Sequence, residues 1–170
     1  AAAASYQRAI ALDGAWPEVH NNLGNALLAL NRLADAAICY RNSLVLAPGS
    51  AEGHANLGGV LQALGQPQEA IFHFRRALEI APDQPDILAS LALAHSAIAD
   101  HAAAMTAIIH ALALQDSAHI RRAFVSCVRH VNFVHQAGAL SALLLRALQE
   151  GWDRPDDLAH IAAIAIKSDP

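Results

Sequence analysis

The sequence predicts an all-α protein, a right-handed superhelical solenoid of antiparallel helix pairs with divergent helices at its C-terminal end. Leu23-Gly24 recurs as Leu57-Gly58 and, in a weaker form, as Leu91-Ala92, each copy 34 residues after the last. A fixed period of roughly 20–50 residues is typical of solenoids, in which each unit buries its apolar face only against its neighbours. The composition agrees, because it is 55% hydrophobic but only 5% aromatic, and Ala and Leu are strong helix formers.

Proline and glycine mark where the predicted helices begin and end. We expect helices over 1–12, Pro17 to about Leu30, Leu33–Leu46, Ala51–Leu64, Pro67–Ile80, Pro85–Ala97 and His101–Leu114, with turns at Asn31-Arg32, Gly65-Gln66 and Ala99-Asp100. Pro17, Pro67 and Pro85 fall in first helical turns, where a missing N–H has no intrahelical partner to lose. Pro48 and Pro82 instead end helices, because the ring clashes with the preceding turn.

The last third of the chain leaves the period but keeps a helical pattern. One apolar face is formed by Ile120, Phe124, Val128 and Val131, which predicts a helix there. A second helix is expected over about Gln136–Glu150, ended by Gly151 in a left-handed conformation with Trp152 folded back on the last turn. Asp153 is expected to cap a final helix over about Arg154–Lys167. These helices predict either a divergent repeat with a capping helix or a connector.

The recurring residues resemble the tetratricopeptide repeat (TPR). In the first unit they are Leu23-Gly24, Leu27, Ala36, Tyr40, Leu44 and Pro48, and in the second Leu57-Gly58, Leu61, Gly65, Ala70, Phe74, Ala77, Leu78 and Pro82. The resemblance implies an array over 1–116, with a half repeat (1–14), repeats at about 17–50, 51–84 and 85–118, and a divergent capping or connector segment over 119–170. The third repeat is degenerate, with Ala92 for Gly, Ile108 for the aromatic residue and Asp116 for Pro. Gly58 and Gly59 are expected at a close helix crossing.

The resemblance also implies a binding groove on the concave face, lined by the first helix of each repeat. By resemblance its residues are Asn21, Asn22, Asn25, Leu28, Ala55, Asn56, Gly59, Gln62, Ser90, Leu93 and Ser96. Asn22, Asn56 and Ser90 hold equivalent places, and such a row resembles the asparagine ladder of O-linked N-acetylglucosamine transferases. An Asn amide both donates and accepts hydrogen bonds, so it can hold a peptide backbone. The alternative is that these amides bond to local backbone or to a neighbouring helix.

Acidic and histidine residues are interpreted as structural. Glu18, Glu52 and Asp86 recur at 34 residues in first helical turns. They could form an acidic stripe that selects basic ligands, but we favour the helix-dipole explanation, which is worth ~0.3–1 kcal/mol for each acid. The ten histidines include no i, i+4 pair and no HExxH, which favours packing roles over metal ligation. The packing histidines are His20, His54 and His95, and a turn is expected between His130 and His135.

Several functions are disfavoured by the sequence. It has no nucleophile elbow, phosphate-binding glycine loop or converging carboxylate pair, so we expect no catalytic residue, cofactor or metal. A net charge of −4 and a pI of about 6.2 provide no basic footprint for nucleic acid. Cys39 and Cys127 are expected to be small buried hydrophobes, and no long uncharged apolar stretch predicts a membrane span.

We therefore expect a protein–protein interaction scaffold or adaptor that binds a peptide or partner helix in the concave groove, located in the cytoplasm. The alternative is the non-catalytic substrate-recognition arm of a larger glycosyltransferase or methyltransferase. The run 147–158 is similar to segments that follow TPR arms in some bacterial transferases. The chain begins with an unpaired second helix bearing Tyr6 and Ile10, so we also expect end-to-end or swapped self-association. The partner is not named by the sequence.

Overall fold

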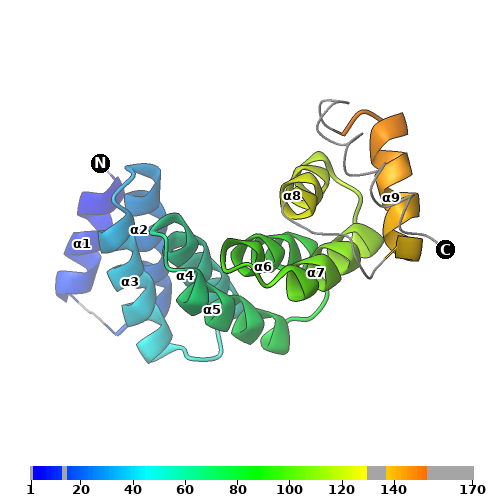
Figure 1. Cartoon of the computed structure of the whole chain (residues 1–170). Helices are drawn as coiled ribbons and strands as arrows, with labels where there is room; N and C mark the ends of the chain where they lie inside the picture. Colours follow the sequence, from blue (N-terminus) through cyan, green and yellow to red (C-terminus); the bar gives the residue numbers. More distant parts are fainter. Residues whose placement is uncertain (1, 13–14, 130–136, 153–170) are drawn as a thin grey trace. The chain divides into compact units, whose positions relative to one another are not determined.

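The computed structural model describes residues 2–12, 15–129 and 137–152, and these residues form nine helices and no strand. The helices are α1 (Ala2–Leu12), α2 (Pro17–Ala29), α3 (Leu33–Leu46), α4 (Ala51–Ala63), α5 (Pro67–Ile80), α6 (Pro85–Ala97), α7 (His101–Leu114), α8 (Ala118–Val128) and α9 (Ala137–Gln149) (Figure 1). The predicted bounds of the first seven are confirmed to within a residue. The expected helix over 154–167 and the turn between His130 and His135 lie outside the described residues.

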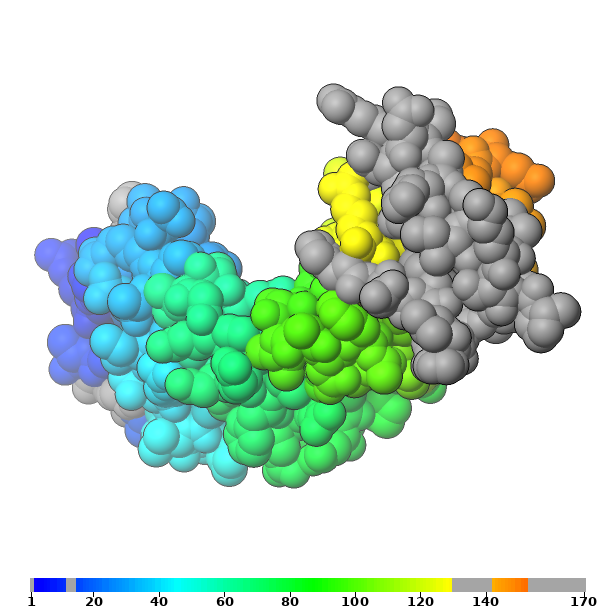
Figure 2. Space-filling model, viewed as in Figure 1, coloured from blue at the N-terminus to red at the C-terminus, as the bar shows by residue number. Residues whose placement is uncertain are grey.

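The chain divides into two compact units, Ala1–Ile87 and Leu88–Pro170. In the first unit, successive helices pack against each other from α1 to α5, and Figure 2 shows them as one continuous body running from blue through cyan to green. In the second unit, α7 packs against α8. The all-α repeat architecture is thus confirmed, whereas the predicted change from array to divergent segment near 116–119 stays a prediction.

The turns inside the three helix pairs repeat one backbone conformation. Asn31, Gly65 and Ala99, spaced by 34 residues, have φ values of 57°, 74° and 59°. After each of them, the second residue of the turn donates its N–H to a carbonyl five residues earlier, as Gln66 does to Leu61 at 2.9 Å. Only glycine adopts positive φ without steric cost. The left-handed turn is therefore imposed by helix packing, even where alanine occupies it.

In the first two helix pairs, a glycine on the first helix lies against an aromatic ring of the second. A Cβ built on Gly24 would stand 2.6 Å from the Tyr40 ring, and one built on Gly58 would stand 2.8 Å from the Phe74 ring. Both rings are buried, so the missing side chain is what lets these helices cross closely. The expectation for Gly59 was wrong, because it is exposed and nothing lies within 4 Å of its added Cβ.

The C-terminal end of α9 is capped as predicted. Gly151 has a φ of 65°, and the Trp152 N–H donates to the carbonyl of Ala147 at 3.0 Å, which is the Schellman pattern. The Trp152 side chain is only 9% exposed and meets Phe124 of α8 edge to face, with ring centroids 5.7 Å apart. The turn after α9 is thereby packed onto α8.

Candidate functional site

A polar crevice of about 280 Å³ lies in the first unit, where the starts of α2 and α4 meet the end of α3. It is lined by Pro17, Glu18, Asn21, Asn22, Ser43, Ala47, Ser50 and Glu52. Two of the predicted groove residues, Asn21 and Asn22, are therefore in one cavity. Two of the three acids interpreted as helix-dipole partners, Glu18 and Glu52, lie there as well, so the crevice is both amide-rich and acidic.

A hydrogen-bond relay crosses from the second repeat to the first beside this crevice. The Nδ2 of Asn56 donates to Oδ1 of Asn21 at 3.0 Å, and Nδ2 of Asn21 donates to Oε1 of Glu52 at 2.9 Å. Each bond fixes an amide orientation, and the second holds the Glu52 carboxylate in place. The amides of Asn21 and Asn56 thus make the inter-helix contacts that the alternative interpretation predicted.

Asn22 differs from its repeat equivalent Asn56. It is exposed, and its side chain makes no hydrogen bond with the described part of the chain. Because a free carboxamide presents a donor and an acceptor side by side, Asn22 has the groups that a peptide backbone needs. The predicted row contains two amide side chains. Asn56 donates its Nδ2 to Asn21, whereas Nδ2 of Asn22 makes no hydrogen bond with the described residues.

The other predicted groove residues of the first unit have mixed surroundings. Asn25 accepts a 2.7 Å hydrogen bond from the Tyr40 hydroxyl, and burial of that phenol raises the pKa of Tyr40 to about 12. Asn25 therefore satisfies a buried polar group. Leu28 is 42% exposed, and Gln62 is half-buried.

The remaining predicted groove residues belong to the second unit. Ser90 is half-buried on α6. Leu93 and Ser96, on the same helix, line a cavity of about 400 Å³ together with Ala97 and with Ser126 of α8. The structure therefore brings Leu93 and Ser96 together, and the row of Asn22, Asn56 and Ser90 stays a prediction.

The three histidines expected to have packing roles are buried, and His54 also pairs with another histidine. His20 and His54 are each 8% exposed, and His95 is 3% exposed. The Pro48 carbonyl lies 3.1 Å from Nε2 of His54, so this nitrogen carries the proton. His54 Nδ1 then accepts from Nδ1 of half-buried His73 at 2.9 Å. Burial, with smaller contributions from His54 and Arg41, lowers the pKa of His73 to about 4.

The His73 pKa predicts acid destabilisation. Because the folded-state pKa is below the unfolded value, His73 favours folding above about pH 6.5, and this contribution is lost as the pH falls toward 4. Allowing for the partial exposure of His73, we expect this loss to lower the free energy of unfolding by about 1–2 kcal/mol. His73→Asn keeps a donor for His54 but cannot titrate, so its stability should fall less over this range. Urea unfolding at pH 7 and 4.5 measures this, with exposed His119→Asn as control, and equal losses in both variants would contradict it.

A closed cluster of charges surrounds Trp152 in the second unit, and the sequence did not reveal it. Asp116 accepts from Arg121 at 2.5 and 2.9 Å and from Arg146 of α9. Glu150 accepts from Arg146 and from Trp152 Nε1, both at 2.8 Å. The hydrogen bond from Arg121 is the largest cause that lowers the pKa of Asp116 to about 2. The acids of this cluster are therefore used to neutralise Arg121 and Arg146.

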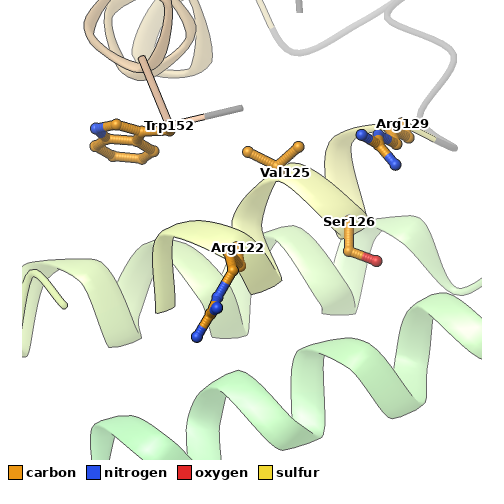
Figure 3. A pocket seen from close by; sticks show the side chains of 5 residues that line it. All are labelled: Arg122, Val125, Ser126, Arg129 and Trp152. Carbon is orange, nitrogen blue, oxygen red and sulfur yellow. The ribbon is translucent and has the colours of Figure 1, made fainter. Parts of the chain in front are cut away.

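A second missed feature is a cavity of about 340 Å³ beside α8. Arg122, Val125, Ser126, Arg129 and Trp152 line it (Figure 3). The side chains of Arg122 and Ser126 project from the same side of the helix in this view. The sequence did signal this cavity: Arg122 and Ser126, spaced i, i+4, lie on the face of α8 opposite its apolar stripe, and Arg129 follows directly after the helix.

The two cysteines are buried, and the described residues form neither a metal-binding group nor a membrane-spanning helix. Cys39 and Cys127 are buried free thiols, and burial raises the pKa of Cys127 to about 12. Within the described ranges, no three His, Cys, Asp or Glu side chains gather to hold a metal ion. None of the described helices has the length and apolarity needed to cross a membrane.

Family models of the tetratricopeptide repeat match residues 17–50 and 51–84. These segments are tetratricopeptide repeats. The two TPRs are the α2–α3 and α4–α5 pairs, whose glycine–aromatic crossings and left-handed turns are described above. Tetratricopeptide repeats are typically non-catalytic interaction modules. No curated protein matches the chain.

Several solved structures share this fold. A crystal structure of MamA matches with a TM-score of 0.68 at 18% identity, covering 98% of this chain and 85% of that one. A second crystal structure of MamA protein matches with a TM-score of 0.67 at 19% identity, covering 98% and 80%. The crystal structure of YrrB, titled a TPR protein with an unusual peptide-binding site, matches with a TM-score of 0.74 at 20% identity, covering 98% and 84%. At these identities the matches show the fold, and the resemblance to transferase arms gains no support from them.

Proposed function

We propose that the chain is a protein-interaction scaffold that binds an extended peptide or a partner helix along the first helices of its TPRs. The observation that carries the proposal is the crevice of about 280 Å³ that contains Asn21 and Asn22. TPR architecture supplies the scaffold, and the exposed amide of Asn22 supplies a donor and an acceptor for a peptide bond. Glu18 and Glu52 in the same crevice favour a peptide with basic or neutral side chains.

Within the crevice, the relay and the free amide have separate roles. Asn56 and Asn21 hold Glu52 and the helices in register, whereas Asn22 has no such task among the described residues. Substituting Asn22 should therefore affect ligand binding without affecting stability. Substituting Asn56 should lower stability, because it removes an inter-repeat hydrogen bond worth about 0.5–1.5 kcal/mol.

The test is a peptide selection followed by a variant comparison. Decapeptides selected on the purified chain from a phage-displayed random library are measured by fluorescence anisotropy. We expect Asn22→Ala to weaken the best binders about 5- to 10-fold, as expected for two lost hydrogen bonds. Asn42→Ala, an exposed residue of α3 in the same repeat, is the matched control and should change nothing. Unchanged affinity in Asn22→Ala would contradict the proposed site.

We also propose that the chain self-associates through α1, as the sequence predicts. Tyr6 and Ile10 of α1 are half-buried, so each still presents apolar area beyond the packing of α1 on α2. We expect the mass measured by light scattering to rise with protein concentration, and less steeply in Tyr6→Ser. A monomeric mass at the highest attainable concentration would contradict this.

A further inference from the structure

The second unit carries two neighbouring cavities that share one residue. The cavity of about 340 Å³ is lined by Arg122, Arg129 and Trp152, and the cavity of about 400 Å³ by Leu93, Ser96 and Ala97. Ser126 of α8 lines both of them. The two cavities therefore adjoin at Ser126, with Arg122 beside one and Leu93 and Ala97 beside the other.

One cation on this surface, Arg122, has no acidic partner among the described residues. Arg121 and Arg146 are neutralised by Asp116 and Glu150. In contrast, Arg122 forms no hydrogen bond or ion pair with described residues, and it is exposed. Among the described residues, no acidic side chain lines either cavity. A guanidinium left unpaired beside a cavity presents five donors in a geometry that fits a carboxylate.

We propose that this surface of α6 and α8 binds an acidic peptide segment. A Glu or Asp carboxylate of the peptide pairs with Arg122, and a neighbouring apolar side chain enters the cavity beside Leu93 and Ala97. Ser126 lines both cavities and so lies between these two positions. This inference rests on the proposed function only in that the ligand is a peptide.

The two units would then select ligands of different charge. Glu18 and Glu52 line the crevice of the first unit, so that site disfavours the acidic peptide that the second unit accepts. The two sites can be tested independently, because Asn22 and Arg122 lie in different units. Failure of one site leaves the measurement on the other unaffected.

The test uses three fluorescein-labelled dodecapeptides that differ only in charge. Each contains one leucine flanked by four glutamates, four glutamines or four lysines. We expect the glutamate peptide to bind the whole chain at least 10-fold more tightly than the glutamine peptide, and the lysine peptide to bind this surface not at all. Raising NaCl from 50 to 300 mM should weaken the binding of the glutamate peptide, because exposed charges are screened.

Variants assign the binding to the surface. Arg122→Gln should weaken the glutamate peptide about 5- to 10-fold, whereas Arg8→Gln, which removes the same charge from exposed α1, should have no effect. Ala97→Lys, at an exposed position that lines the second cavity, should strengthen the binding of the glutamate peptide. Asn22→Ala should leave it unchanged. Equal binding of the glutamate and glutamine peptides, equal losses in Arg122→Gln and Arg8→Gln, or tighter binding of a labelled oligothymidine would each overturn the proposal.

Discussion

Gly58→Ala should destabilise the second TPR even though alanine is the better helix former. Replacing Gly by Ala inside a helix gains about 1 kcal/mol. The new Cβ, however, would stand 2.8 Å from two ring atoms of Phe74, and Phe74 is 2% exposed, so the ring has no room to move away. Overpacking of this kind costs about 1–3 kcal/mol or more. We expect a net loss of up to about 2 kcal/mol in the free energy of unfolding.

The neighbouring glycine provides the control. Gly59 lies in the same helix with open space around its Cβ position, so Gly59→Ala should gain up to about 1 kcal/mol. Urea unfolding followed by circular dichroism at 222 nm measures both variants. The double variant Gly58→Ala/Phe74→Ile should recover part of the loss, because the third helix pair buries Ala92 and Ile108 at these positions. Equal stability of the two single variants would refute the crossing argument.

Trp152→Ala should cause a large loss of stability in the second unit. Trp152 is 9% exposed, meets Phe124 edge to face, and lies beneath the guanidinium groups of Arg121 and Arg146 at 4.9 and 5.4 Å. Truncating a buried tryptophan costs about 3–5 kcal/mol. We expect about 3 kcal/mol, because the arginines keep their bonds to Asp116 after the ring is lost.

The chain has two tryptophans, so a matched control exists. Trp16 is 59% exposed, and Trp16→Ala should change stability by less than about 0.5 kcal/mol. Trp152→Phe should keep most of the stability, because it retains the ring packing on Phe124 and loses the hydrogen bond to Glu150. Chemical denaturation followed by circular dichroism compares the three. A Trp152→Ala midpoint equal to that of Trp16→Ala would contradict the role assigned to this ring.

The helices were predictable because their ends are marked by local chemistry. Pro67 begins one helix, and Gly65 forms the left-handed turn before it, so both effects act within a few residues of the chain. The close contact of Gly58 with Phe74 was also predictable, since it depends on repeat phase. Gly59 was misplaced because adjacent helical residues point about 100° apart, and only one of two neighbouring glycines can face the crossing.

The site chemistry was less predictable because it depends on side-chain contacts between repeats. Repeat phase aligns Asn22 with Asn56, but the hydrogen bond runs from Asn56 to Asn21. A choice between two adjacent amides depends on the rotation of each helix about its axis. The charge cluster at Trp152 likewise joins Asp116 to Arg146, 30 residues later. Neither spacing follows the 34-residue period, so periodicity could not indicate these partners.

The Asn56–Asn21–Glu52 relay also bears on how such an array can grow. Asn21 has Ala55 as its equivalent in the second repeat, whereas Glu52 and Asn56 have Glu18 and Asn22 in the first. A tandem duplication of residues 17–50 would therefore rebuild the relay at the new junction, with every donor matched. A duplication of residues 51–84 would place the copied Asn56 opposite Ala55, and the relay would be lost at that junction. Lengthening the protein by copying its first repeat should thus preserve the junction chemistry, and copying its second should not.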